Sequence, residues 1–130
     1  MNNSVLFDKI GVIIVLYFPT VNQLKRLKKL ESFKYVIVVD NTPDIDNSGL
    51  IPQGIDYFPL KANKGIAIAQ NIGVEIVKSF NVDYIVFFDQ DSCYSEELIN
   101  NLYNAYCEFE KIDTKIGAIG PKCIDPRNSK

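Results

Sequence analysis

The sequence predicts an α/β domain in which helices cover both faces of a mainly parallel sheet, a three-layer α/β/α arrangement. Two observations lead to this class. Segments rich in β-branched residues alternate with segments of helical periodicity along the 130 residues, which is the order expected for parallel strands joined by helices. The first two strand candidates also lack polar alternation, which is typical of strands that are covered on both faces.

Five short runs of apolar residues are predicted to be strands. The third run, Ile55–Leu60, is the weakest candidate, because Pro59 cannot donate a hydrogen bond to a neighbouring strand and favours a sheet edge or a strand end. The fourth run, Tyr84–Phe88, is expected to be buried on both faces, and two carboxylates, Asp89 and Asp91, follow it directly. The predicted strands are Gly11–Tyr17, Tyr35–Asp40, Ile55–Leu60, Tyr84–Phe88 and Ile116–Gly120.

Three segments with one apolar stripe are predicted to be helices. Ser95 is the predicted N-cap of the last helix. Residues 41–54 are rich in Asn, Asp, Pro and Gly and are interpreted as a loop within one domain that spans residues 1–130. The predicted helices are Val21–Leu30, Ile66–Phe80 and Glu96–Phe109.

Composition excludes several classes of function. The net charge of −2 argues against a dedicated nucleic-acid-binding protein, which usually carries a basic excess. The chain has no histidine, so serine–histidine and cysteine–histidine catalysis are excluded within it, and oxygen ligands or thiolates would have to hold any metal. Three cysteines without a CxxC pair fit a reducing compartment. The basic stretch Lys25–Lys29 is interpreted as a solvated helix face, with a membrane-surface role as the weaker alternative.

Polar residues follow four of the predicted strands at the point where each strand ends. In open α/β sheets, ligands bind outside the carboxyl ends of the strands. The agreement among four strand ends therefore predicts a binding site at this edge. The residues that follow the strands include Tyr17, Asp40, Lys64, Gly65, Asp89, Gln90 and Asp91.

Asp89 and Asp91 are candidate metal ligands. If the chain stays extended there, their side chains leave on the same side, with α-carbons roughly 6–7 Å apart. Two hard oxygen donors so placed suit Mg²⁺ or Mn²⁺, especially when phosphate oxygens complete the coordination. The alternative is a solvated turn in which Asp91 or Ser92 caps the next helix. Taken alone, so short a motif favours that alternative.

Lys64 and Gly65 stand where a loop becomes a helix. A helix N-terminus offers free N–H groups and a positive dipole end to a phosphate, and Lys64 adds a charge. Gly65 could equally serve only the turn. The segment is neither a Walker A sequence nor GxGxxG, so those binding modes are not supported.

Asp40 and Tyr17 are candidates for binding a base. Asp40 could accept a ring N–H from a pyrimidine, and Tyr17 could stack on the ring. The alternatives are that Asp40 begins an Asx-turn through Asn41 and that Tyr17 only packs. For each residue taken alone, these alternatives are slightly favoured.

Five segments follow one another between Gly11 and Lys122: IIVLY, VVDNT, NKGIAIAQNIG, FFDQDS and GAIGPK. In this order and over this range, the sequence resembles family 2 glycosyltransferases with the GT-A fold. DQDS and the NxGIAxAxN pattern resemble the rhamnosyltransferase-like branch of that family. The resemblance implies a nucleotide-diphospho-sugar transferase fold. It also implies an inverting transfer of a sugar, with rhamnose as one candidate, from a dTDP- or UDP-sugar to a saccharide or lipid-linked acceptor in cell-surface polysaccharide synthesis.

The resemblance also implies roles for particular residues. The second aspartate of the DxD motif contacts a divalent metal, Mg²⁺ or Mn²⁺, and the first holds the ribose or the metal's waters. Tyr17-Phe18-Pro19 departs from the Thr-Tyr-Asn-like sequence that many relatives carry after the first strand. The implied metal ligands are Asp89 and Asp91, and the implied nucleotide-sugar-binding residues are Tyr17, Asp40, Lys64, Gly65, Asn71, Asp89 and Gln90.

Relatives continue past the predicted fifth strand into a half that binds the acceptor and supplies the general base. The chain is therefore expected to be the donor-binding half, without an identifiable general base. A cytoplasmic location is expected, with peripheral attachment at the inner membrane face and homodimer formation left open.

Two other classes of protein are weighed against this one. A phospho-accepting receiver domain could use Lys122, but it needs an acidic cluster at the end of the first strand, where none stands. A nucleotidyltransferase on a related fold needs a basic triphosphate loop directly after that strand, and this is also missing.

Overall fold

Four parallel strands form the centre of the computed structural model, which describes residues 2–112 and 115–127. The described residues fall into two compact units, one ending at Tyr94 and the other beginning at Ser95, and the sheet belongs to the first. Its strand order is β3-β2-β1-β4. The strands are β1 (Ile10–Leu16), β2 (Tyr35–Asp40), β3 (Asp56–Pro59) and β4 (Tyr84–Asp89).

The first four predicted strands are confirmed, with boundaries that agree within one residue. Pro59 is the last residue of β3, and β3 is an edge strand, as the missing N–H of proline suggests. The parallel sheet and its flanking helices are consistent with a GT-A-type α/β fold. Two short helices were not predicted, α1 (Asn3–Phe7) and the 3₁₀ helix η2 (Ser48–Leu50).

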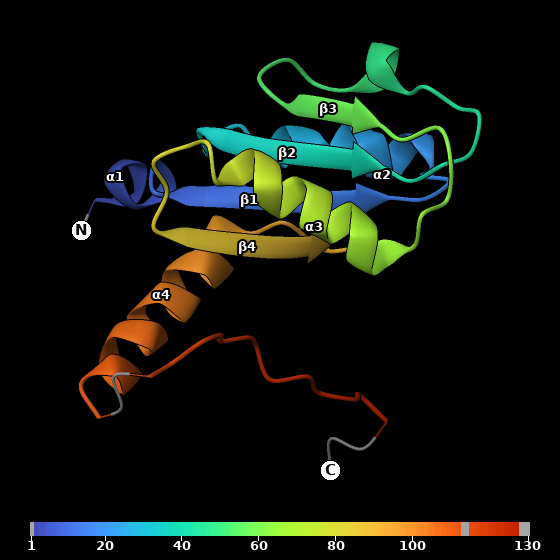
Figure 1. Ribbon diagram of the computed structural model, residues 1–130. Coiled ribbons are helices and arrows are strands. Elements are labelled where there is room, and N and C mark those ends of the chain that lie inside the picture. The colour runs from blue at the N-terminus through green and yellow to red at the C-terminus, as the bar shows by residue number, and fades with distance from the viewer. Residues whose placement is uncertain (1, 113–114, 128–130) are drawn as a thin grey trace. The chain divides into compact units, whose positions relative to one another are not determined.

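Helices cover opposite faces of the sheet (Figure 1). The chain passes from β1 to β2 through α2 (Val21–Arg26), and from β3 back to β4 through α3 (Ile66–Val77). These two connections run in opposite directions across the sheet. Crossover connections between parallel strands are right-handed, so two connections that run in opposite directions place their helices on opposite faces of the sheet.

The α2 segment begins with a capping box. Thr20 accepts a hydrogen bond from the backbone N–H of Gln23, and the Gln23 side chain accepts one from the backbone N–H of Thr20. The predicted helix over 21–30 continues as the 3₁₀ helix η1 (Leu27–Leu30). Its predicted apolar side is confirmed, since Leu24, Leu27 and Leu30 are all buried.

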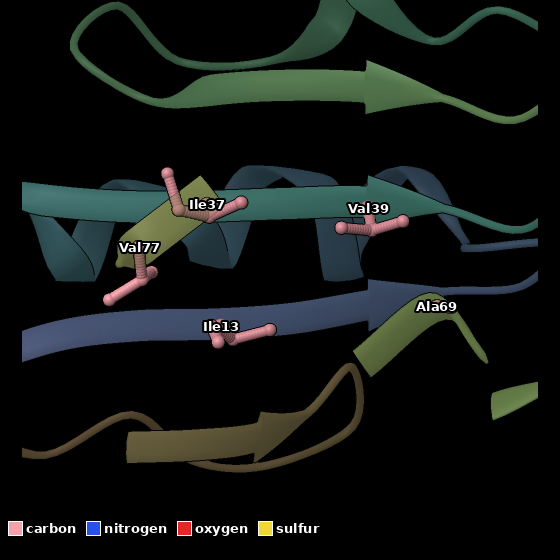
Figure 2. Close-up of a cluster of buried hydrophobic side chains, with 5 residues drawn as sticks. All are labelled: Ile13, Ile37, Val39, Ala69 and Val77. Atoms are coloured by element: carbon pink, nitrogen blue, oxygen red, sulfur yellow. The ribbon is translucent and has the colours of Figure 1, made fainter. Parts of the chain in front are cut away.

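The core between α3 and the sheet is a cluster of five buried apolar residues from β1, β2 and α3 (Figure 2). Gly73 lies in this interface, and a β-carbon at that position would stand 2.6 Å from Cγ2 of Ile13. The absence of a side chain therefore lets α3 approach β1 closely. The cluster consists of Ile13, Ile37, Val39, Ala69 and Val77.

The prediction that β4 is buried on both faces is wrong. Ile85 and Phe87 are 37% and 49% exposed. They pair with Gly11 and Ile13 of β1, so they lie on the face of the sheet on which α3 packs. This helix packs mainly on β1 and β2, and it leaves that face of β4 largely uncovered.

The second unit contains α4 (Glu96–Glu110), and its predicted N-cap is confirmed: Ser95 accepts a hydrogen bond from the N–H of Leu98. The predicted strand Ile116–Gly120 is wrong, because these residues form neither helix nor strand. Two of its five residues are glycines, and proline follows it, so the run offers few side chains to bury and has low strand propensity. Among the described residues, none of the helices is both long and apolar enough to span a membrane.

We expect Gly73→Ala to destabilise the protein. In a free helix interior this change usually stabilises by about 1 kcal/mol, but here the new methyl group would meet Ile13 in a packed core. The expected loss in the free energy of unfolding is about 1–3 kcal/mol, measured by urea denaturation.

Gly49→Ala is the matched control, since a β-carbon there meets nothing within 4 Å. It should change stability by no more than about 0.5 kcal/mol. A Gly73→Ala protein as stable as the wild type would contradict the close approach of α3 and β1.

Candidate functional site

A hollow of about 410 Å³ opens at the carboxyl edge of the sheet. It is bounded by the ends of β1 and β4, by the residue after β2 and by the start of α3. Four of the residues that the sequence indicates meet here: Tyr17, Gly65, Asp89 and Gln90. The remaining lining residues are Val15, Asn41, Asn63 and Ile66.

The Gln90 side chain joins the end of β4 to the end of β1. Its Oε1 accepts a hydrogen bond of 2.8 Å from the N–H of Tyr17, and its Nε2 donates one of 3.1 Å to the Tyr17 carbonyl. The last backbone pair of this ladder is Val15 with Asp89. The amide of Gln90 thus continues the pairing beyond the strands and holds Tyr17 next to the acidic end of β4.

Tyr17 and Phe18 form an exposed pair of rings, which we call the aromatic platform. Their ring centroids lie 4.8 Å apart at an interplanar angle of 73°, and the two residues are 46% and 55% exposed. Phe18 has a φ of 44°, in the left-handed region that non-glycine residues rarely adopt. Its N–H donates a 2.9 Å hydrogen bond to Oγ1 of the fully buried Thr42. The platform offers flat apolar surface on which a planar ring could stack.

Asp40 lies beneath the edge and has no exposed surface. Its Oδ1 accepts a hydrogen bond of 3.0 Å from the N–H of Thr42, which confirms the Asx-turn that the sequence allowed. Its Oδ2 accepts two more, of 2.6 Å from the hydroxyl of Tyr57 and 2.8 Å from the amide of Asn47. Direct contact between Asp40 and a base would require these bonds to rearrange, and that role stays a prediction.

Tyr57 remains a hydrogen-bond donor at neutral pH. Burial, and then its hydrogen bond to the Asp40 carboxylate, raise the pKa of the Tyr57 phenol above its ordinary value. The phenol oxygen also accepts a 2.8 Å hydrogen bond from the N–H of Asn47. Tyr57 and Asn47 therefore tie the loop over 41–54 to the end of β2.

Two asparagines shape the loop that enters α3. Asn41 accepts a 2.8 Å hydrogen bond from the N–H of Lys64 and donates one of 3.0 Å to Oδ1 of Asn63. The same oxygen of Asn63 accepts a 3.0 Å bond from the N–H of Gly65. Gly65 is the N-cap residue, with a φ of 84°, and no side chain caps the helix. The first-turn N–H groups of α3 therefore begin beside the hollow without a side-chain acceptor.

The chain turns directly after β4 instead of staying extended. The N–H of Ser92 donates a 3.0 Å hydrogen bond to the carbonyl of Asp89, so the spacing expected for an extended Asp89-Gln90-Asp91 does not apply. The alternative of a solvated turn is confirmed for the turn itself, but its cap is wrong, because Ser95 and neither Asp91 nor Ser92 caps the next helix. Both aspartates are exposed. No side chain in the described parts of the chain hydrogen-bonds to either carboxylate.

The two aspartates fit only part of a metal site. Within residues 2–112 and 115–127, no three His, Cys, Asp or Glu side chains gather in a way that could hold a metal ion. Asp89 and Asp91 could supply two carboxylate ligands. That set suits Mg²⁺ or Mn²⁺, which commonly takes one or two carboxylates and completes its shell with water and phosphate oxygens.

Arg26 is a neighbour of this turn that the sequence did not single out. Its guanidinium lies 3.5 Å from the carbonyl oxygen of Asp91, at the limit for a hydrogen bond. Burial raises the pKa of the nearby Tyr94 to about 12, although the positive charge of Arg26 acts in the opposite direction. Arg26 thus points toward the acidic turn, while Lys25, Lys28 and Lys29 are exposed, consistent with a solvated face.

Four residues indicated by the sequence do not line the hollow: Asp40, Lys64, Asn71 and Asp91. Asp40 is buried beneath the edge, Lys64 is exposed and contributes its backbone N–H to the loop network, and Asp91 is an exposed residue within the turn after β4. Asn71 lies on the outer face of α3, where it lines a second hollow of about 440 Å³ with Ile68, Ile72, Glu75 and Ile76. Residues of a single helix, α3, line that second hollow, and no residue from a strand end contributes to it. We therefore place the candidate site at the first hollow, on the carboxyl edge of the sheet.

Sequence reasoning missed the roles of Asn41, Asn63 and Tyr57. Asn41 and Asn63 stand directly after β2 and before α3, so their position alone marked them as edge residues. No comparable signal marked Tyr57, because it lies inside a strand and its partner is 17 positions away in the sequence.

Comparisons with known proteins are consistent with this geometry. Residues 19–122 match the model of a family described as Glycosyl transferase family 2. The chain is 34% identical over 122 residues to a dTDP-rhamnosyl transferase, RfbF, of Shigella flexneri. The alignment covers 91% of this chain and 40% of that relative, so the chain spans less than half of the relative's length. No match to a solved structure was found.

We expect Gln90→Ala to loosen the end of β1. The substitution removes both hydrogen bonds to Tyr17, each of which stabilises by about 0.5–1.5 kcal/mol. The amide proton of Tyr17 should then exchange with solvent about tenfold faster, since tenfold corresponds to about 1.4 kcal/mol. Amide hydrogen exchange followed by NMR measures this rate.

Gln53→Ala removes an exposed glutamine from the 41–54 loop and serves as the control; it should leave the exchange of Tyr17 unchanged. Unchanged exchange of Tyr17 in Gln90→Ala would show that the amide contact does not hold the strand end.

Proposed function

The chain belongs to glycosyl transferase family 2, and on that premise we propose that it forms the nucleotide-sugar-binding part of an inverting glycosyltransferase. The proposed donor is a dTDP- or UDP-sugar. Rhamnose is the favoured sugar, because the relative from Shigella flexneri is a dTDP-rhamnosyl transferase. The observation that carries the proposal is the meeting of Tyr17, Gly65 and Asp89 at one hollow on the carboxyl edge of a parallel sheet.

The proposed base position lies over the aromatic platform. Tyr17 lines the hollow, and the amide of Gln90 holds its backbone in place. The buried Asp40 does not line the hollow, but its contacts set the path of the chain after β2, where Asn41 does. The volume of about 410 Å³ falls within the usual range for small-molecule sites.

The proposed diphosphate position lies between the start of α3 and the end of β4. The N-terminus of α3 offers uncapped N–H groups and the positive end of the helix dipole. Lys64 stands beside it and adds a positive charge. These groups would offset part of the charge that the diphosphate carries.

Asp89 and Asp91 are the proposed ligands of a divalent ion, Mg²⁺ or Mn²⁺. Both carboxylates are exposed, and no side chain among residues 2–112 and 115–127 hydrogen-bonds to either of them, which supports this assignment. When bound, such an ion stabilises the negative charge that grows on a departing nucleoside diphosphate. The role of the two carboxylates is to hold that ion beside the diphosphate end of the hollow.

The proposed reaction joins the anomeric carbon of the sugar to a hydroxyl oxygen of an acceptor, a saccharide or a lipid-linked molecule. The hydroxyl attacks from the face opposite the diphosphate, so the configuration inverts. The bond between the anomeric carbon and the diphosphate oxygen breaks, the nucleoside diphosphate leaves, and a general base takes the hydroxyl proton. We assign the general base to no described residue, because the carboxylates at the edge are already proposed to serve the donor. We therefore expect donor binding, with little sugar transfer, from these 130 residues. Efficient transfer to an added acceptor would contradict this expectation.

We expect binding of dTDP or UDP to depend on Mg²⁺ or Mn²⁺ and on Asp91. Asp91→Asn removes the charged oxygen ligand and should weaken nucleotide binding in the presence of the metal by at least about tenfold, or about 1.4 kcal/mol. Isothermal titration calorimetry with each nucleotide, with and without metal, measures the effect.

Asp8→Asn is the control, since it makes the same charge change before β1, at the opposite ends of the strands. Nucleotide binding that needs no metal and is unaffected by Asp91→Asn would remove the metal assignment.

We expect Tyr17→Ala to weaken nucleotide binding through the loss of stacking. Stacking of a base on an aromatic side chain contributes about 1–3 kcal/mol, so affinity should fall about 5- to 150-fold. Tyr17→Phe keeps the ring and should stay within about twofold of the wild type. Inorganic diphosphate has no base, and its affinity should not depend on either substitution; an equal loss for diphosphate would argue against a base at this position.

A further inference from the structure

A chain of hydrogen bonds connects Tyr57 to the aromatic platform. The Tyr57 hydroxyl donates to Oδ2 of Asp40 at 2.6 Å, and Oδ1 of Asp40 accepts from the N–H of Thr42 at 3.0 Å. Oγ1 of Thr42 then accepts from the N–H of Phe18 at 2.9 Å. Three short contacts thus run from β3 through the end of β2 to the residues after β1.

The two residues in the middle of this series of hydrogen bonds have no access to solvent. Asp40 and Thr42 are both fully buried. Water cannot readily replace a donor that is lost there, and a buried carboxylate short of donors is costly. Removal of the Tyr57 hydroxyl should therefore shift Asp40 and the backbone that it holds.

Phe18, at the far end of this series of hydrogen bonds, has a strained backbone. Phe18 has a φ of 44°, which its side chain does not favour. Its N–H bond to Thr42 helps to hold that conformation, which places the Phe18 ring against the ring of Tyr17 with centroids 4.8 Å apart. The platform therefore depends on a residue that would relax if Thr42 moved.

We propose that Tyr57 is a positioning residue for nucleotide binding, acting through Asp40 and Thr42 on the aromatic platform. The inference rests on the proposed function, and it extends it to a residue that does not line the hollow. Asn47 supports the same carboxylate through a second donor, so loss of the Tyr57 hydroxyl alone should weaken the chain without breaking it.

The test compares Tyr57→Phe, Thr42→Val and the double variant. Calorimetry with dTDP and with UDP in the presence of Mg²⁺ gives the dissociation constants, at a temperature well below the unfolding midpoint of every variant. Tyr57→Phe should weaken binding about three- to tenfold. In the Thr42→Val background, where the acceptor for Phe18 is already gone, Tyr57→Phe should change affinity less than about twofold.

Tyr35→Phe is the matched control, because it removes a hydroxyl from the first residue of β2, at the end of that strand away from the hollow. It should leave nucleotide affinity unchanged. A second measurement follows the amide exchange of Phe18, which should be faster in Tyr57→Phe than in the wild type or in Tyr35→Phe.

The outcomes separate the two proposals. If the wild type binds nucleotide and Tyr57→Phe binds it equally well, the positioning role is overturned and the proposed function stands. An equal loss in both backgrounds would also overturn it, since Tyr57 would then act independently of Thr42. If the wild type binds neither nucleotide, both proposals fall.

Discussion

Side-chain hydrogen bonds take over at the carboxyl edge of the sheet where the backbone ladder stops. Gln90 joins the ends of β1 and β4, Asp40 gathers donors from its own turn and from β3, and Asn41 ties β2 to the start of α3. No buried side-chain nitrogen or oxygen in the described residues lacks a partner. The loops that surround the hollow therefore follow paths that these few polar groups dictate.

The apolar part of the sheet provides the rigid base for this edge. β1 and β2 are buried along almost their whole length, and α3 approaches β1 closely because Gly73 has no side chain. Parallel strands in such a core all end on the same side. The arrangement places the exposed rings and carboxylates at one edge without requiring them to pack, so they remain accessible to a ligand.

Much of this architecture could be predicted from the sequence, because its signals are local. Runs of apolar residues, β-branched in the first two, marked the first four strands, Gly65 marked the start of α3, and Ser95 marked the cap of α4. The predicted strand over 116–120 failed because two glycines leave little to bury. The site was harder, since its contacts join residues far apart: Gln90 and Tyr17 are separated by 73 positions, which no periodicity records.

The bidentate contact of Gln90 with Tyr17 has a consequence for any ligand that spans the hollow. One end of such a ligand would rest on the platform after β1, and the other would lie against the turn after β4. Because one amide joins the two ends, ordering either one by a bound fragment lowers the entropic cost of ordering the other. A base and a diphosphate bound as separate molecules would then show positive cooperativity, and discrimination among bases would depend on what occupies the phosphate end.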